Sequence, residues 1–423
     1  MNKPTFDVVV FGATSFVGQI LCRYLLKEYG GTGQGGARKL KWAISGRSKS
    51  KLDELVASLG PDAKSLSIII ADAADEKALE VLCADTRVVV STVGPYALYG
   101  EPLVRVCTRL GTDYCDLAGE TPWIRRMIAK YSDAASKSGA RVVHCCGFDS
   151  IPSDMGVWFL QQQSMRHFGE PCTEIKMRVK AMRGAASGGT VASMLNIVRE
   201  ATKNPELRKE LRDPYSLCPP DADGATKKPR QTNTSGATFD EDFKAWSAPF
   251  VMAAINVRVV LRSNAVRSYQ YGREFRYDEA MLTGKGFSGR SKAMAVTAGL
   301  GGFVAAAAMP ATRWLMEKLM LPAPGEGPSP EAQEKGFFDL RFVGRTGDGR
   351  ELRATVTGDR DPGYGSTAKM LGEAAACLAQ DVPKDKVSGG FWTIDRAGQV
   401  AACAARGACR PCIQIDGVSL SPR

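Results

Sequence analysis

Short apolar runs alternate with longer amphipathic stretches over the first third of the chain. The runs have the length and the β-branched content of buried strands, and they lie at residues 8–11, 40–45, 67–71, 87–92, 113–117 and 141–145. The stretches between them have the apolar spacing and flanking residues of helices, at 16–29, 75–84, 102–110 and 122–138. This alternation predicts an α/β protein with a Rossmann-like, doubly wound parallel sheet.

The pattern changes after residue 152. It predicts helices at about 153–165 and 190–202, and strands at 174–182, 250–261, 269–277, 337–344 and 351–358. These elements predict a second α+β domain built on a mostly antiparallel sheet. Residues 204–245, rich in Pro, Asp, Lys, Thr and Asn, are typical of a long surface excursion. We therefore divide the chain into a Rossmann-like domain at 1–152, a second domain at 153–393 and a tail at 394–423.

Residues 293–312 form an apolar segment without a single charge, and Arg290, Lys292 and Arg313 flank it. The segment is long enough to cross a bilayer, but its alanines, glycines and Pro310 make it a poor membrane-spanning helix. Four interpretations stay open: a lid over a lipid-like substrate, shallow attachment to a membrane or lipid droplet, true spanning, and burial in the core.

The turn after the first strand carries the strongest functional signal. Gly12 stands where the chain must turn sharply into a helix, and Gly18 lets that helix pack close to the sheet. The N-terminus of a helix offers unpaired N–H groups and a positive dipole end to a pyrophosphate. An ordinary tight turn is the alternative interpretation. The predicted phosphate cradle comprises Gly12, Ala13, Thr14, Ser15, Phe16, Val17 and Gly18.

The loop after the second strand predicts which dinucleotide binds. An NAD-specific site places an acid here, against the ribose 2′-hydroxyl, but this loop has none. Arg47 and Lys51 instead offer two cations and Ser48 a hydroxyl, which suits a 2′-phosphate; a solvated basic loop is the alternative. We therefore predict NADP(H) as the cofactor, contacted here by Gly46, Arg47, Ser48 and Lys51, and by Asp72 after the third strand.

The loop after the fourth strand should reach the same crevice, because ligands bind at the carboxyl ends of parallel strands. From this loop we expect contacts to the nicotinamide by Val93, Gly94, Pro95 and Tyr96. Tyr96 and Tyr99 are the candidate catalytic residues, as proton donor or oxyanion partner, and simple packing is the alternative.

Further polar groups are expected near the crevice. Asp116, Glu120 and Asp149 follow strands, where they either reach the crevice or only cap helices. Gly188 and Gly189 precede a predicted helix, so their N–H groups either hold a substrate oxygen or form a plain N-cap turn.

Composition limits the class of protein. The chain has 423 residues, 44% of them hydrophobic, and 12 scattered cysteines that do not suggest a disulfide framework. Cys403, Cys409 and Cys412 lie close together without a histidine, so we predict no metal site. The net charge of +11 comes without basic–aromatic interleaving, so we expect no nucleic-acid partner. We expect a cytoplasmic protein, with peripheral attachment to a membrane or lipid droplet and a homodimer left open.

The chain resembles the saccharopine dehydrogenase-like oxidoreductases, and within them the trans-acting enoyl reductases. The blocks that carry this resemblance are residues 12–19, 45–47, 93–96, 99–102, 113–120, 147–154, 187–190, 361–365 and 367–370. The resemblance implies an NADP-binding Rossmann domain, a mixed α/β second domain and reduction of a substrate double bond in lipid or glycolipid assembly. Ser15 departs from the glycine usual in the family, and a serine is tolerated there if its φ is negative. After Thr393 the sequence also departs from the family pattern. A shifted reading frame or an alternative terminus would produce such a departure.

These observations predict an NADP-dependent oxidoreductase that acts on a lipid, polyketide or glycolipid-precursor substrate. One alternative is a non-catalytic dinucleotide-binding protein attached to a membrane or lipid-droplet surface. The other is an imine-reducing, saccharopine-type dehydrogenase, which residues 293–312 disfavour because a polar amino-acid substrate has no need of them.

Overall fold

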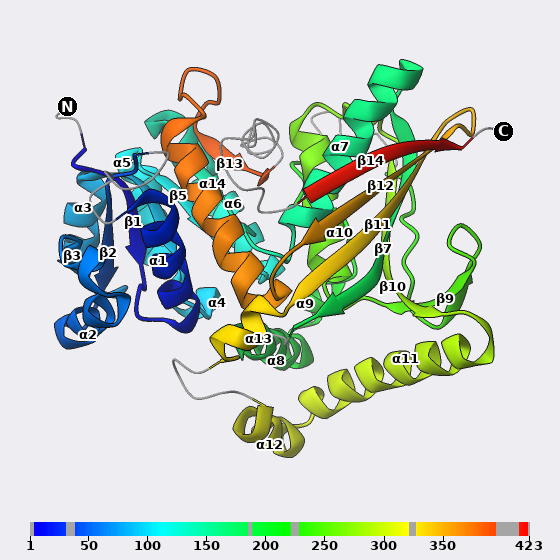
Figure 1. The fold of residues 1–423 in the computed structure, drawn as a ribbon, viewed down its shortest axis with the longest axis horizontal. Coiled ribbons are helices and arrows are strands. Elements are labelled where there is room, and N and C mark those ends of the chain that lie inside the picture. Colours follow the sequence, from blue (N-terminus) through cyan, green and yellow to red (C-terminus); the bar gives the residue numbers. More distant parts are fainter. Residues whose placement is uncertain are drawn as a thin grey trace.

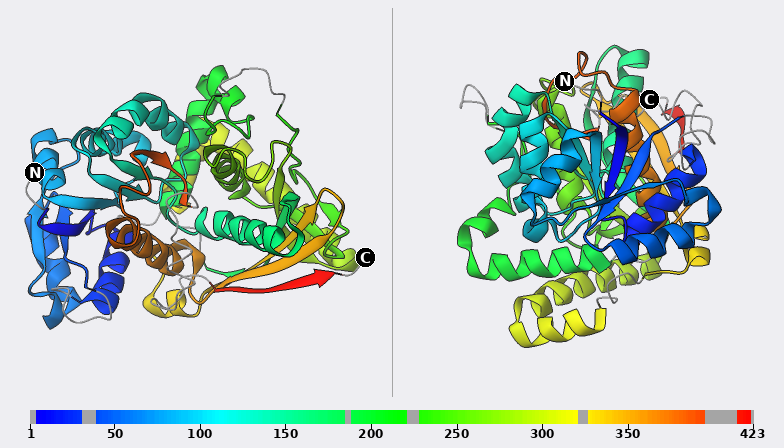
Figure 2. Two further views of the ribbon diagram at one scale, coloured as in Figure 1. Left: turned by 90° about the horizontal axis from the view of Figure 1, so that it is seen from above. Right: turned by 90° about the vertical axis from the view of Figure 1, so that its left-hand side faces the viewer.

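The computed structural model describes residues 4–30, 39–184, 188–220, 228–320, 327–394 and 414–421. Within these residues the chain forms two seven-stranded sheets, here called sheet A and sheet B. The two sheets lie beside each other (Figures 1 and 2). The blue and cyan elements and the orange α14 (Thr367–Gln380) and β13 (Gly390–Trp392) surround sheet A, and most of the green, yellow and red elements surround sheet B.

Sheet A is parallel and has the strand order β13-β6-β5-β4-β1-β2-β3. Its strands are β1 (Phe6–Phe11), β2 (Trp42–Gly46), β3 (Ser67–Ile70), β4 (Thr86–Ser91), β5 (Asp113–Asp116), β6 (Arg141–Val143) and β13 (Gly390–Trp392). In β1, Val8 and Val10 pack into one buried cluster, and Val9 and Phe11 pack into another on the opposite face. Burial on both faces explains why this strand reads as an unbroken apolar run.

Helices cover both faces of sheet A, which confirms the predicted doubly wound α/β fold. One face is covered by α1 (Phe16–Tyr29), α2 (Lys49–Leu59) and α14 (Thr367–Gln380), and the other by α3 (Glu76–Ala84), α5 (Glu101–Leu110) and α6 (Thr121–Ser138). A short helix, α4 (Tyr96–Tyr99), begins at the carboxyl end of β4, and a 3₁₀ turn at Pro61–Ala63 follows α2.

The C-terminal part of the chain returns to sheet A. α14 packs beside β1 and β4, and β13 adds the edge strand next to β6 (Figure 1). Arg141 of β6 pairs with Asp113 and also donates to the Leu378 carbonyl of the returning segment at 2.7 Å. Sheet A therefore uses residues from both sides of the boundary that the sequence suggested at 152/153.

Sheet B is mixed, with the order β14-β12-β11-β7-β10-β9-β8. Its strands are β7 (Cys172–Arg183), β8 (Thr238–Asp240), β9 (Ala245–Pro249), β10 (Arg276–Gly284), β11 (Phe337–Thr346), β12 (Glu351–Gly358) and β14 (Gln414–Ser421). Among the described strands, β7 and β10 pair in parallel and the other neighbours pair antiparallel, which agrees with the predicted α+β arrangement. Part of the predicted tail thus forms an edge strand, β14, beside β12.

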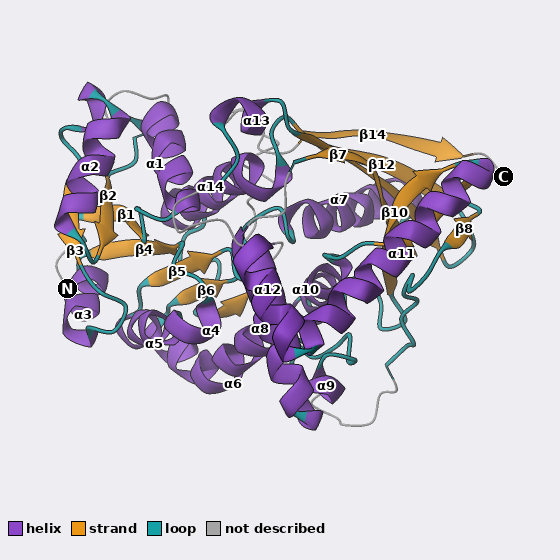
Figure 3. Ribbon diagram, turned by 90° about the horizontal axis from the view of Figure 1, so that it is seen from below, coloured by secondary structure: helices purple, strands orange, loops and turns teal. Residues whose placement is uncertain are grey.

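The remaining helices, from residue 151 to residue 334, pack on sheet B or lie on the lower face of the molecule, which Figure 3 shows from below. They are α7 (Ile151–Phe168), α8 (Gly188–Lys203), α9 (Pro205–Glu210), α10 (Ala253–Val266), α11 (Gly286–Ala308), α12 (Pro310–Met320) and α13 (Pro330–Glu334). A π-helical turn at Pro362–Ser366 leads into α14.

Two predicted strands are wrong. Most of residues 250–261 belong to helix α10, and residues 269–275 form turns before β10 begins at Arg276. α10 buries Ile255, Val259 and Leu261 together with polar residues on other sides, so its sequence lacks the one-sided apolar spacing of a surface helix. A short run with several valines and no such spacing cannot be distinguished from a strand by periodicity.

Residues 204–245 are more than a surface excursion. They contribute α9 and β8, and residues 211–215 and 228–235 line an internal cavity; residues 221–227 lie outside the described part.

The apolar segment 293–312 spans most of α11 and the start of α12. Within it only Ala293 and Ala307 are buried, so burial in the core is not its role. α11 is the one helix in the described residues that is long and apolar enough to cross a membrane, which by itself is weak support for membrane insertion.

Candidate functional site

The turn from β1 into α1 has the geometry of a phosphate cradle. Gly12 has a φ of +85°, and Ser15 is the N-cap of α1 with a φ of −66°. The negative φ of Ser15 is the condition under which a serine is tolerated at this position. The Ser15 hydroxyl accepts from the Gly18 N–H at 2.9 Å and donates to Thr92 Oγ1 at 2.9 Å. Phe16 and Val17 begin the helix, so their N–H groups have no intrahelical acceptor.

A side-chain atom added at Gly12 or Gly18 would clash with the protein itself. A Cβ on Gly12 would lie 2.5 Å from Val93 Cγ2, and a Cβ on Gly18 would lie 2.4 Å from the Gly12 carbonyl oxygen. The turn and the first residues of α1 line a cavity at the helix N-terminus, so the residues present fit a dinucleotide pyrophosphate. Ala13 and Gly18 lie beneath the turn and do not face the cavity, and the Ala13 N–H donates to the Ser45 carbonyl at 3.0 Å.

Ser15→Ala is expected to lower the free energy of unfolding by about 1 kcal/mol, because the Gly18 N–H loses its acceptor at the start of α1. Ser15→Gly should cost only a few tenths of a kcal/mol, since glycine is itself a good N-cap. Urea unfolding measures both, with Ser136→Ala on exposed α6 surface as the control. An equal loss in the alanine variant and the control would contradict the capping role.

Arg47, in the loop after β2, and Lys51, in the first turn of α2, have exposed side chains that line the same cavity. Ser48 is the N-cap of α2, and its hydroxyl accepts from the Lys51 N–H at 3.5 Å. Among the described residues, neither cation forms an ion pair, so both are available to a phosphate. Asp72, half-buried after β3, lines the cavity as well and accepts from the Ala74 N–H at 2.9 Å.

Tyr96 begins α4 and is buried against Trp123, with 5.4 Å between ring centroids. Its hydroxyl donates to the Ser91 carbonyl at 2.9 Å, and burial raises its pKa well above the usual range. The Glu120 carboxylate accepts hydrogen bonds from the N–H groups of Tyr96 at 2.8 Å and Ala97 at 2.9 Å, and these bonds fix the start of α4. The Tyr96 hydroxyl is therefore already engaged, whereas Tyr99 is 50% exposed on the cavity wall.

A single cavity of about 2200 Å³ brings the predicted groups together. Among them, the residues that line it are Gly12, Thr14, Ser15, Phe16, Val17, Gly46, Arg47, Ser48, Lys51, Asp72, Val93, Gly94, Pro95, Tyr96 and Tyr99. The loops after β1, β2 and β4 therefore meet at one crevice, at the carboxyl ends of the sheet A strands.

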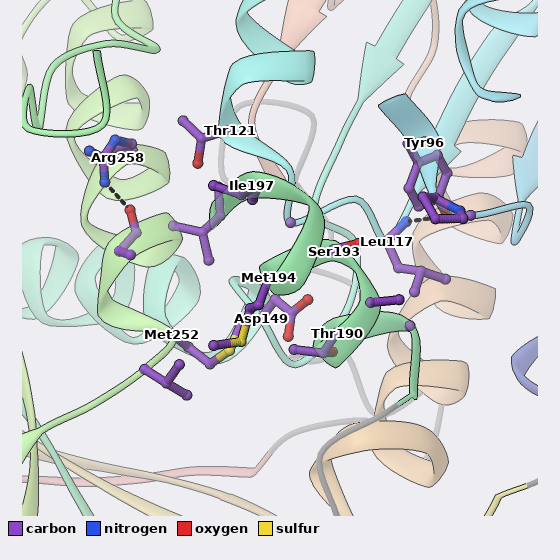
Figure 4. A pocket seen from close by; sticks show the side chains of 18 of the residues that line it. Tyr96, Leu117, Thr121, Asp149, Thr190, Ser193, Met194, Ile197, Met252 and Arg258 are labelled. Carbon is purple, nitrogen blue, oxygen red and sulfur yellow. Dashed lines mark hydrogen bonds between the residues drawn. The ribbon is translucent and has the colours of Figure 1, made fainter. Parts of the chain in front are cut away.

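The far wall of the cavity is mostly apolar and comes from the second half of the chain. Figure 4 shows Met194 and Ile197 of α8 and Met252 before α10 around this wall. Leu300 and Phe303 of α11 close it on the outer side. The apolar part of this wall suits an aliphatic chain. Charged side chains also line the cavity on this side, namely Arg212, Asp213, Lys228, Arg230 and Arg258.

Asp149 is a carboxyl group that lines the cavity from the sheet A side. It lies in the loop after β6, where burial raises the pKa of its carboxyl to about 6. Among the described residues, no hydrogen-bond donor contacts its carboxylate. By contrast, Asp116 is wholly buried outside the cavity, bonded to His144 Nδ1 at 2.7 Å and to the Tyr114 hydroxyl at 3.0 Å.

The start of α8 is held over the cradle by Tyr364. The Gly188 N–H donates to the Tyr364 hydroxyl at 3.0 Å, and the Tyr364 ring packs edge-on against Phe16 at 4.8 Å. The Gly188 N–H is thus engaged within the protein, while Gly189 lines the cavity beside it.

Sequence reasoning missed several groups of this site. Arg258 of α10 donates to Ser216 Oγ at 3.0 Å and to the Leu211 carbonyl at 2.7 Å, and burial lowers its pKa (Figure 4). Its helix was predicted as a strand, so no pattern pointed to it. Tyr364 lies inside one of the blocks that carry the family resemblance, which was the available signal. In the described residues no cluster of His, Cys, Asp and Glu could hold a metal ion, and Cys403, Cys409 and Cys412 lie outside that part.

Comparisons with known proteins identify the family of the chain. Residues 8–143 match the saccharopine dehydrogenase NADP-binding domain. A Mycobacterium tuberculosis protein with the provisional name trans-acting enoyl reductase is 36% identical over 414 residues, 95% of this chain and 93% of its own length. A trans-acting enoyl reductase of the same species is 37% identical over 388 residues, 89% of each chain. A saccharopine dehydrogenase structure from Saccharomyces cerevisiae aligns over 98% of this chain and 99% of its own, with a TM-score of 0.48 and 14% identity.

The protein is an NADP-dependent oxidoreductase with a dinucleotide-binding α/β fold. The alternative of a non-catalytic binding protein is therefore set aside. The chain belongs to the trans-acting enoyl reductases, a family with the saccharopine dehydrogenase NADP-binding domain.

Proposed function

We propose that this oxidoreductase reduces a carbon–carbon double bond conjugated to a carbonyl group, in an acyl chain of lipid, polyketide or glycolipid-precursor type. The observation that carries the proposal is the apolar cavity that runs from the dinucleotide cradle to α8 and α11. The enoyl reductase names of relatives that align over most of the chain support the same reaction class.

The predicted cofactor contacts divide into two sets in this proposal. The turn at Gly12 and the start of α1 hold the pyrophosphate, and Arg47, Ser48 and Lys51 hold the 2′-phosphate. Val93, Gly94 and Pro95 lie along the nicotinamide. Bound NADPH supplies a hydride, which the acceptor takes at the carbon β to its carbonyl.

Asp149 is our first candidate for the proton donor. The carbon α to the carbonyl needs one proton for each hydride received, and an acid with a pKa near 6 is partly protonated at neutral pH. After transfer, the carboxylate recovers its proton from solvent through the open side of the cavity. Tyr99 is the second candidate, and Tyr96 fits better as a packing residue because its hydroxyl donates to Ser91.

Oxidation of NADPH in the presence of 2-enoyl thioesters of increasing chain length tests this function. We expect long-chain acceptors to give a lower KM, with deuterium from labelled NADPH at the β carbon and solvent deuterium at the α carbon. Turnover with a 2-oxo acid and an amine, but none with enoyl thioesters, would instead establish the imine-reducing alternative.

A further inference from the structure

We infer that α11 and α12 form a docking surface for an anionic phospholipid bilayer, and that the acyl substrate enters the cavity from this side. The entry route rests on the proposed function, whereas the docking surface stands on its own observations. Both helices run along the outer face of the molecule, away from sheet A (Figures 1 and 3).

Large apolar side chains on this surface face solvent. Phe287 is 84% exposed and Leu319 74% exposed, and Trp314 is more than half exposed. Met294 and Leu315 are exposed in the same two helices. Exposed apolar side chains concentrated on adjacent helices mark a surface that is covered in function, because leaving them in water is unfavourable.

The charges around these side chains favour binding to an anionic surface. Arg290, Lys292, Arg313 and Lys318 are the basic residues of 286–320, and Glu317 is the acid. In the described residues, none of the four cations forms an ion pair. Lysine and arginine beside apolar side chains can keep their charges among phosphate headgroups while the apolar groups enter the acyl region.

α11 lies along the protein and does not leave it as a spanning helix would. A Cβ on Gly289 would meet the Gly284 carbonyl oxygen at 2.2 Å, and Thr283 Oγ1 donates to the Gly289 carbonyl at 2.8 Å. The first turn of α11 is thus fixed against the end of β10. Lateral packing of this kind is compatible with shallow docking and excludes a helix surrounded by lipid at that end.

The same helix borders the cavity. Thr297, Leu300 and Phe303 of α11 line the cavity across from α8, so α11 stands between the cavity and the proposed membrane surface. An acyl chain that enters beside α11 stays in apolar surroundings from the bilayer to the cavity. It would thereby avoid the free-energy cost of crossing water.

Vesicle flotation tests the docking surface. We expect the full-length protein to float with phosphatidylcholine vesicles that contain phosphatidylglycerol, and to bind pure phosphatidylcholine at least about tenfold more weakly. Phe287→Ser with Leu319→Ser should weaken binding to the mixed vesicles about tenfold or more. Lys292→Glu with Lys318→Glu should remove the preference for phosphatidylglycerol. The matched controls are Val81→Ser and Lys77→Glu on α3, at the opposite end of the molecule (Figure 1).

The outcomes separate docking from the proposed function. Both parts are supported if Phe287→Ser with Leu319→Ser loses vesicle binding and turnover of a vesicle-bound acceptor. The same variant should keep the thermal melt of the wild type and its turnover of a short, water-soluble enoyl thioester. If the wild type does not bind mixed vesicles, or binds pure phosphatidylcholine equally well, the inference is wrong. It is also wrong if the wild type sediments as a dimer that Phe287→Ser with Leu319→Ser converts to a monomer, since a second copy would then cover this surface. If the wild type does not reduce the short thioester, the proposed reaction is contradicted. The vesicle result then still decides whether the docking surface exists.

Discussion

Asp149→Asn is expected to lower kcat by about 10²- to 10⁴-fold, because the variant cannot donate a proton to the acceptor carbon. Its affinity for NADPH should stay close to that of the wild type. The wild-type kcat/KM should fall above about pH 6, where the raised pKa of the Asp149 carboxyl leaves fewer molecules protonated. Stopped-flow oxidation of NADPH across pH measures both effects.

Two control variants make this result specific. Asp133→Asn changes an exposed carboxylate on α6 and should leave the pH profile unchanged. Tyr99→Phe tests the second candidate: a larger loss in this variant than in Asp149→Asn would assign the proton to Tyr99.

The same carboxyl affects stability with a definite sign. Its pKa is about 6 in the folded protein and about 3.9 in an unfolded chain, so the folded state holds the proton more tightly. Ionisation of Asp149 therefore costs stability as pH rises from about 4 to 6, and the full cost is present above that range. At pH 8 the Asp149→Asn variant should melt at a higher temperature than the wild type, and the difference should shrink as pH falls through this range.

Arg47→Asp is expected to weaken NADPH binding by about 100-fold, since a charge-assisted contact to the 2′-phosphate is replaced by repulsion. NADH binding should change much less, because NADH lacks that phosphate. Titration calorimetry with both nucleotides measures the difference. Lys49→Asp is the matched control, because Lys49 begins α2 two positions after Arg47 but pairs with Asp53 and does not line the cavity. Equal binding of NADH and NADPH by the wild type would disprove the role of this loop.

The first six strands of sheet A follow from the sequence because each is a local apolar run, whereas α2, α14 and β13 were not predicted. A strand such as β1 is buried on both faces, so its apolar run is continuous, and Ser15 needed only a negative φ to act as a cap. The cavity wall depends on distant segments instead. The raised pKa of Asp149 comes from burial in the folded cavity, and the engaged Tyr96 hydroxyl depends on its approach to Ser91. The burial of Asp149 is set by distant segments, whereas Ser91 lies only five residues before Tyr96 and their contact forms across the loop between β4 and α4. α10 was mistaken for a strand for a related reason, since burial on several sides removes the helical signal.

The return of the chain to sheet A has a consequence for how the protein forms. The dinucleotide half cannot be complete when the ribosome has made only its first 152 residues, because α14 and β13 are synthesised much later. Until then β6 has an open edge, and the buried Arg141 side chain lacks its bond to the Leu378 carbonyl. The apolar face later covered by α14 is also exposed during this period, which favours aggregation over early cofactor capture. Nascent chains of this protein are therefore expected to need protection by chaperones until nearly the whole sequence has emerged.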